Sequence, residues 1–183
     1  MINFLYRLLL AFNSTSLIIV VFLVKEKTTI NWSANLSWIP SYISYIIYFC
    51  IPVVLTYLSL LLSRFLATDS LEKDNDTSKV LEIEQANNVF LPSYLGYFFV
   101  ALSVPYCETL VWVFFILFVF TFLSQTLYFN PLFLLFGYKF YYLTSINKVK
   151  MFVITRESLK SPLDIDLPYL RRINNFTFVD KRK

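Results

Sequence analysis

Few side chains in this 183-residue sequence have the types and spacing that enzyme chemistry needs. The sequence contains no histidine, which removes the usual general base, the Ser-His and Cys-His nucleophile pairs, and most zinc sites. Cys50 and Cys107 lie in separate apolar segments, and the only glycines are Gly96 and Gly137, so neither a CxxC pair nor a glycine-rich phosphate loop exists. We therefore expect a protein that is not an enzyme, with no catalytic residues, metal ligands or cofactor.

Glu108 is the only acidic residue within the hydrophobic segments. A carboxylate at membrane depth suggests a functional role by default, because burying its charge is costly. Here that role would be sensing or ion binding. Glu108 also falls at a predicted turn between two apolar segments, where water reaches it, so a solvated loop residue is the favoured alternative.

A polar run, Asn13 to Ser16, lies in the middle of the first apolar segment. Such residues can line a conduction path, or they can form hydrogen bonds between packed helices. The second interpretation is favoured, because the chain lacks the several buried ionisable groups that transporters use.

Basic residues concentrate in the C-terminal tail. They can contact anionic lipid or a nucleic-acid-associated partner, or they can act as topology determinants on solvated strand faces. Arg171 and Arg172 form the most concentrated internal pair. The tail cations are Lys139, Lys148, Lys150, Arg156, Lys160, Arg171, Arg172, Lys181, Arg182 and Lys183, and we assign a partner- or lipid-facing role to Lys139, Lys148, Lys150, Arg156, Arg171 and Arg172.

Composition indicates that these residues belong to a membrane protein. The sequence is 57% hydrophobic and 15% charged, with a mean hydropathy of +0.61, whereas soluble domains have about 25% charged residues. Its four apolar segments cover residues 4–24, 39–63, 89–107 and 109–129, and the last two read as a transmembrane hairpin broken at Pro105 and Glu108. One kinked span plus a re-entrant segment is the alternative.

The fold class expected is an α-helical membrane protein with four transmembrane helices and a small cytoplasmic β-domain. We expect four regions along the chain. Residues 1–63 contain helices 1 and 2 with an outer loop, and residues 64–88 form a cytoplasmic loop with one strand. Residues 89–129 form the helix 3–4 hairpin, and residues 130–183 contain an interfacial segment and the β-domain. With four spans, 14 of the 16 lysines and arginines lie on one side. The positive-inside rule then places both termini in the cytoplasm.

The β-domain is predicted from alternating sequences. "KVLEIE" in the middle loop, and "YKFYYLTS", "VKMFVIT" and "NNFTFVDK" in the tail, are typical of strands, with a hairpin turn at "INK". We expect these four to form one antiparallel sheet. "DSLEKDNDTS" is expected to be a polar, mobile segment and "SPLDIDLP" a loop.

Three residues mark the junction between the last apolar segment and the β-domain. Asn130-Pro131 disfavours a continuous helix, because proline donates no hydrogen bond and the residue before it avoids helical geometry. "LFLLF" then becomes a short interfacial segment, and Gly137 permits the turn out of it.

The order of these parts resembles the KwaA family, the membrane subunit of the Kiwa anti-phage defence system. "KVLEIE", "FNPLFLLFGYKFYYLTS", "VITRESLKSP" and "LRRINNFTFVDK" carry the resemblance, which covers about Lys79 to the C-terminus. It implies a four-span homo-oligomer such as a tetramer, which responds to infection and holds a soluble DNA-binding partner, KwaB, at the membrane. No catalytic residues carry over, and no direct contact with nucleic acid is expected. The matching residues are read as structural: Asn130, Pro131, Gly137, Tyr138 and Lys139.

Two hypotheses follow for function. The first is a sensor and scaffold subunit that oligomerises in the inner membrane and recruits the soluble partner. The alternative is a small channel or membrane-depolarising effector, motivated by the polar run from Asn13 to Ser16.

Overall fold

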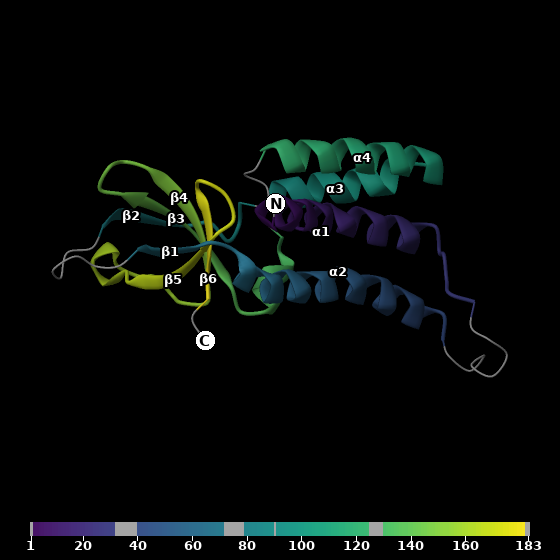
Figure 1. Ribbon diagram of the computed structural model, residues 1–183. Helices are drawn as coiled ribbons and strands as arrows, with labels where there is room; N and C mark the ends of the chain where they lie inside the picture. The colour runs from purple at the N-terminus through teal and green to yellow at the C-terminus, as the bar shows by residue number, and fades with distance from the viewer. Residues whose placement is uncertain (1, 32–39, 72–78, 90, 125–129, 182–183) are drawn as a thin grey trace. The chain divides into compact units, whose positions relative to one another are not determined.

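The computed structural model describes residues 2–31, 40–71, 79–89, 91–124 and 130–181 (Figure 1). The chain forms two compact units, which are described separately. The sheet unit comprises Met1–Leu8, Ser59–Val89 and Pro131–Lys183, and the helical unit comprises Leu9–Leu58 and Phe90–Asn130.

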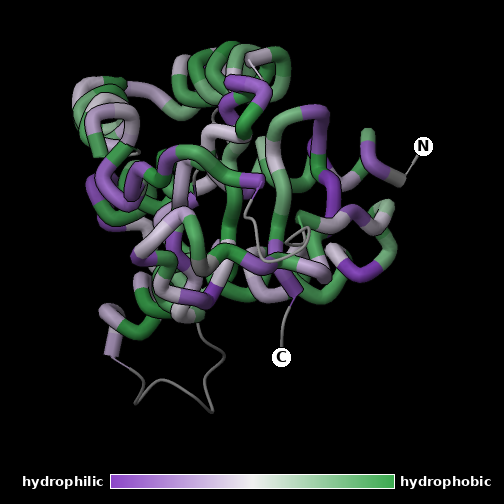
Figure 2. The backbone as a smooth tube through the Cα atoms, turned by 90° about the vertical axis from the view of Figure 1, so that its left-hand side faces the viewer, coloured by the Kyte–Doolittle hydropathy of each residue, from purple (hydrophilic) through white to green (hydrophobic). Residues whose placement is uncertain are grey.

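The apolar segments form helices α1 (Ile2–Lys25), α2 (Tyr42–Leu62), α3 (Leu91–Ser103) and α4 (Cys107–Ser124). A 3-10 turn, η2 (Ser63–Phe65), extends α2. The helical turns that are visible end-on in Figure 2 are mostly coloured as hydrophobic. Among the described residues, three helical segments are long and apolar enough to cross a membrane: Asn3–Lys25, Tyr42–Phe65 and Cys107–Ser124.

The predicted third span is the exception. With 13 residues, α3 rises about 20 Å, which is less than the roughly 30 Å hydrocarbon core. The break between the third and fourth segments lies at residues 104–106, so Glu108 belongs to the first turn of α4 rather than to a loop. The expected loop position of Glu108 is therefore wrong, but its side chain is exposed.

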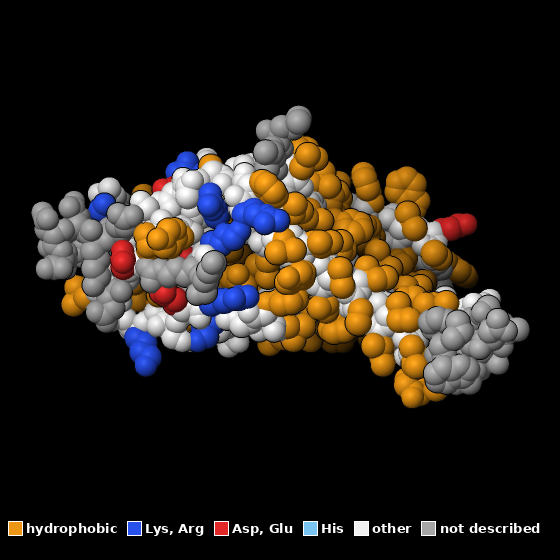
Figure 3. All heavy atoms as spheres, turned by 60° about the horizontal axis from the view of Figure 1, so that its bottom comes forward, with side chains coloured by type: hydrophobic (Ala, Val, Ile, Leu, Met, Phe, Trp, Pro, Cys, Tyr) orange, Lys and Arg blue, Asp and Glu red, His pale blue; other side chains and the backbone are white. Residues whose placement is uncertain are grey.

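The core of the helical unit lies where α1 meets α3 and α4. Ile18 and Phe22 of α1 pack with Ala101, Val104 and Leu110. Many large apolar side chains of these helices point outward, and hydrophobic atoms cover much of the helical surface seen in Figure 3. Such a surface suits lipid contact or association with another protein.

The sheet unit contains a six-stranded mixed sheet. Its strands are β1 (Thr68–Leu71), β2 (Val80–Gln85), β3 (Lys139–Ser145), β4 (Lys150–Thr155), β5 (Leu167–Arg172) and β6 (Thr177–Asp180), in the order β1-β5-β6-β4-β3-β2. Only the β4–β6 pair among the described strands is parallel. Both strands of the α2–α3 connection therefore form the sheet edges, and the four strands of the tail lie between them.

All four predicted strands are present, as β2, β3, β4 and β6, and the β3–β4 turn forms at Ile146 to Lys148. Three expectations were wrong. The polar segment contributes β1 from Asp69 to Leu71, part of "SPLDIDLP" opens β5, and the sheet is mixed rather than antiparallel. β1 has only four residues and β5 carries Pro168, so neither shows the pattern of a strand by itself.

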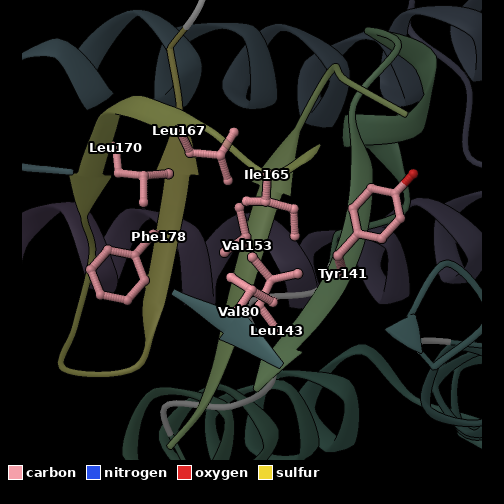
Figure 4. Close-up of a cluster of buried hydrophobic side chains, with 8 residues drawn as sticks. All are labelled: Val80, Tyr141, Leu143, Val153, Ile165, Leu167, Leu170 and Phe178. Atoms are coloured by element: carbon pink, nitrogen blue, oxygen red, sulfur yellow. The ribbon is translucent and has the colours of Figure 1, made fainter. Parts of the chain in front are cut away.

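Both faces of the sheet are covered by apolar side chains. One face carries a core of eight residues, drawn in Figure 4, in which Ile165 comes from the segment after η3 (Pro162–Asp164): Val80, Tyr141, Leu143, Val153, Ile165, Leu167, Leu170 and Phe178. On the other face, Phe133 of α5 (Leu132–Leu135) packs edge-to-face on Phe140, which stacks on Phe152 at 5.8 Å between ring centroids. Successive side chains of a strand point to opposite faces of the sheet, which explains why neighbouring apolar residues of one strand contribute to both faces.

Candidate functional site

A polar cluster is buried among the helices. Asn13 of α1, Thr56 of α2 and Asn130 are all almost fully shielded from solvent. With its amide oxygen facing Thr56, Asn13 accepts hydrogen bonds from Thr56 Oγ1 at 2.7 Å and from Asn130 Nδ2 at 2.8 Å, while its Nδ2 donates to the Pro52 carbonyl at 3.2 Å. Asn130 Nδ2 also donates to Thr56 Oγ1 at 3.2 Å. Three segments distant in sequence are thus joined by neutral hydrogen bonds.

The remaining polar residues of the run bond mainly within their own helix. The hydroxyls of Ser14 and Thr15 donate to Ala11, and that of Ser16 donates to Asn13. The Ser14 carbonyl accepts a hydrogen bond from Tyr94 Oη at 2.8 Å, which links α1 to α3. The favoured interpretation of the run, hydrogen bonding between helices, is confirmed for Asn13 and for the Ser14 backbone, whereas the three hydroxyls form intrahelical bonds.

Glu108 stands apart from this cluster at the N-terminal end of α4. A carboxylate in a first turn interacts favourably with the helix dipole. The described residues contain no group of three or more acidic, cysteine or histidine side chains that could hold a metal ion. A sensing role for Glu108 stays a prediction.

Lys150, the first residue of the inner strand β4, lies between a carboxylate and an aromatic ring. Its Nζ is 2.8 Å from Glu84 of β2 and 4.3 Å from the centroid of the Tyr142 ring. The hydrogen bond with Glu84 raises the pKa of Lys150, and partial burial raises the pKa of Tyr142 although Lys150 opposes that shift. Lys150 is therefore already neutralised by a neighbour, in a solvent-exposed and salt-sensitive pair.

The pair Arg171-Arg172 is divided between the two faces of the sheet, because successive residues of a strand point in opposite directions. Arg172 forms an ion pair with Asp69 of β1, in which Nη2 at 2.7 Å and Nε at 3.1 Å both donate to the single oxygen Oδ2. Arg171 instead donates from Nη1 to the Leu66 carbonyl at 3.1 Å and to Thr68 Oγ1 at 3.3 Å. Both arginines thus hold β1, but they do not form one basic patch.

The other predicted cations have separate environments. The Arg156 guanidinium lies 4.7 Å from the Tyr138 ring centroid, and Lys139 donates to Ser158. Burial raises the pKa of Tyr138, which Arg156 partly offsets. Lys148 occupies the β3–β4 turn with a φ of 59°. A partner- or lipid-facing role for any of these residues stays a prediction.

At the junction, α5 turns the chain into β3. Gly137 has a φ of +77°, a left-handed conformation that glycine adopts without strain. The Gly137 N–H donates to the Leu134 carbonyl at 3.0 Å and the Tyr138 N–H donates to the Phe133 carbonyl at 3.1 Å, which closes the end of α5. The predicted short segment and its glycine turn are confirmed; its position at a membrane interface stays a prediction.

A pocket of about 200 Å³ opens on the sheet face that carries the eight-residue core. Met151, Val153, Leu170 and Phe178 contribute apolar lining, and the Arg172–Asp69 ion pair lies beside them. This combination of an apolar floor and a charged margin suits a single side chain of another protein better than a substrate.

The model of the family described as anti-phage protein KwaA matches residues 6–179, nearly the whole chain. The chain belongs to the KwaA family. No curated protein and no solved structure matches it. Membership in the KwaA family confirms the resemblance and extends it from Lys79 back to the first helix.

Sequence reasoning missed two sets of residues in this KwaA-family chain. Thr56, the partner of Asn13, is a single hydroxyl in an apolar helix, and its position four residues after Pro52 was the only available signal. Arg64 follows the second apolar segment as a single cation, and nothing local in the sequence links it to its neighbours Arg171 and Lys181, which come from a strand and a strand end far along the chain. Tryptophan is enriched at the headgroup level of membranes, which makes Trp32 and Trp38 candidate anchors by sequence, and both lie outside the described residues.

Proposed function

We propose that this KwaA-family protein is a non-enzymatic membrane sensor and scaffold of an anti-phage defence system. It crosses the bacterial inner membrane with both termini and the sheet unit on the cytoplasmic side, and it forms a homo-oligomer. It recruits a soluble DNA-binding partner of the KwaB type, as the resemblance implies. Family membership and three helices of membrane-crossing length support this proposal.

A fourth crossing through α3 is part of the proposal. Only three residues separate α3 from α4, which favours an antiparallel hairpin. The Lys25 Nζ donates to the Val104 carbonyl in this connection at 2.5 Å, so the end of α1 and the hairpin turn lie together. An even number of crossings would keep the basic segments on one side. The short α3 would be accommodated by local thinning of the bilayer.

The observation that carries the sensor proposal is that the two edge strands, β1 and β2, both come from the segment that connects α2 to α3. β1 begins three residues after η2, at the end of α2, and β2 ends six residues before α3. These two strands form the opposite edges of the sheet, with the tail strands between them. A displacement of α2 against α3 would therefore act directly on both edges, which gives the helices a short mechanical route to the sheet.

The scaffold proposal rests on the pocket beside Arg172 and Asp69, which a side chain of the soluble partner would enter. Co-purification of the full chain with the product of its neighbouring gene tests recruitment. Ser70→Trp would fill the pocket and is expected to abolish co-purification, whereas Leu163→Trp, on the exposed η3 turn, serves as the matched control. A partner-free wild-type protein under mild detergent would overturn the proposal. Native mass spectrometry of the same sample measures the oligomer number.

A channel is the second candidate function, and the buried polar cluster favours it because polar groups inside a helical bundle can line a pore. The mutual hydrogen bonds of Asn13, Thr56 and Asn130 support a packing role instead. Ion flux in liposomes separates the two. A flux that persists when Asn13 and Ser16 are replaced by leucine would eliminate this lining.

A further inference from the structure

Three cations gather on one face of the sheet unit: Arg64, Arg171 and Lys181. Arg171 lies opposite Val179 in the β5–β6 pair, and the Lys181 N–H donates to the Tyr169 carbonyl at 3.1 Å. Lys181 thus follows Val179 by two residues and shares its face, at about 7 to 8 Å from Arg171 between Cα atoms by sheet geometry. Arg171 Nη1 contacts the Leu66 carbonyl, two residues beyond Arg64.

No carboxylate neutralises this group within the described part of the chain. The three ion pairs found there are Lys25–Glu26, Lys150–Glu84 and Arg172–Asp69, and none involves Arg64, Arg171 or Lys181. Desolvation, together with the nearby Arg64 and Arg171, lowers the pKa of Lys181. Arg171 Nε is shielded from solvent and has no acceptor among the residues that the structure describes. The cluster therefore carries uncompensated positive charge and an unused hydrogen-bond donor.

The same cluster borders apolar surface. Leu62 and Phe65, at the end of α2, are exposed, with Phe65 at 59%. The Arg64 guanidinium lies 5.2 Å from the Phe65 ring centroid. A ligand that fits must combine an anionic group with a long apolar part.

We propose that Arg64, Arg171 and Lys181 bind the phosphate of an anionic membrane lipid, whose acyl chains lie along Leu62 and Phe65. This inference rests on the proposed membrane location of α2. The phosphate oxygens accept hydrogen bonds from Arg64 and Lys181, and a small rotation of Arg171 offers Nε to the same group. Arg171 also holds Thr68, so an occupied site would stabilise the attachment of β1 to β5.

The other tail cations lack this combination. Arg172 is paired with Asp69 and Lys150 with Glu84, so a lipid phosphate would have to compete with a carboxylate. Lys160 of the tail and Lys79 before β2 are exposed and provide matched controls of equal charge.

The experiment titrates the full chain in detergent with short-chain phosphatidylglycerol, with short-chain phosphatidylcholine and with inorganic phosphate, and measures binding by native mass spectrometry. The variants are Arg64→Gln/Lys181→Gln, the control Lys79→Gln/Lys160→Gln, and the charge-retaining Arg64→Lys/Lys181→Arg. We expect a preference for phosphatidylglycerol that falls roughly five-fold for each charge removed at the site, with little change in the control and recovery in the charge-retaining variant.

An equal loss of phosphatidylglycerol binding in the control variant would overturn the proposed site, because the effect would then come from the overall positive charge of the protein. Inorganic phosphate that binds as tightly as the lipid would overturn the assignment to a lipid. Carbonate extraction of membranes separates this inference from the proposed function. Wild-type protein that is released by carbonate contradicts the membrane location, whereas inserted protein without a lipid preference contradicts this inference alone.

Discussion

The two units of the molecule distribute their polar and apolar side chains in opposite ways. The helical unit buries Asn13, Thr56 and Asn130 and exposes large apolar side chains such as Phe120. The sheet unit buries Phe140 and Leu143 completely and places its ion pairs at the surface. This contrast supports the proposal of two different surroundings: an apolar one for the helices, where neutral hydrogen bonds join the segments, and water for the sheet, where apolar burial is the main stabilising force.

The largest effect is expected when the same substitution is made in both units. Phe140→Ala should destabilise the sheet unit by about 3 to 5 kcal/mol, because Phe140 is 0% exposed and packs against two other rings. Phe120→Ala in α4, where the side chain is 64% exposed, should change stability by about 0.5 kcal/mol or less. Limited proteolysis across a urea series measures both. A large effect at Phe120 would show that another protein, rather than lipid, covers α4.

A charge placed on exposed isoleucine distinguishes the two surroundings directly. Ile116, in the middle of α4, and Ile146, in the β3–β4 turn, are 49% and 57% exposed. Ile116→Lys should cost about 3 kcal/mol of membrane insertion, because a lysine at the helix centre must be desolvated. Ile146→Lys should insert normally. Carbonate extraction of membranes measures how much of each variant is inserted. Equal insertion of both variants would contradict the proposed difference in surroundings between the two units.

The two glycines provide a comparison of backbone requirements. Gly137→Ala should destabilise the sheet unit by about 1 to 2 kcal/mol, since its φ of +77° disfavours any side chain although open space surrounds the new Cβ. Gly96→Ala in α3 meets no atom either, and should stabilise its helix by about 0.5 to 1 kcal/mol. Increased protease cleavage after Phe136 would report the destabilisation by Gly137→Ala. Resistance to protease in Gly137→Ala would argue against a role for this turn.

The smallest effect concerns the buried amide network. A double-mutant cycle of Asn13→Leu and Thr56→Val should give a coupling of about 0.6 kcal/mol and at most about 1.7 kcal/mol. Asn13→Leu combined with Ser103→Ala should be additive, because the Ser103 hydroxyl bonds to Val100 in its own helix. Thermal unfolding in detergent measures both cycles, and additivity in the first would mean that the contact contributes nothing.

Most of the secondary structure was predictable because it depends on local patterns. The alternation of apolar residues in "KVLEIE" and "YKFYYLTS" gave β2 and β3, and the proline and glycine between Pro131 and Gly137 gave α5 and its turn. β1 and β5 were missed because each depends on its neighbours in the sheet. α3 is shorter than its apolar segment, since the chain leaves the helix at Ser103 before Pro105.

The candidate sites were less predictable, because they join residues that are far apart. Arg171 and Arg172 looked like one basic patch, whereas strand geometry sends them to opposite faces and to different partners. Arg64, Arg171 and Lys181 come together only through the register of β5 and β6.

The sequence by itself determined the apolar helices, the alternation of four strands and the absence of histidine chemistry, because each of these depends on composition or on a local period. The tertiary structure alone decided that β1 and β2 form the edges of the sheet and that Asn13 meets Thr56 and Asn130. The physical reason is that hydrogen bonds between distant segments depend on how the chain folds back on itself, and this information has no local periodicity.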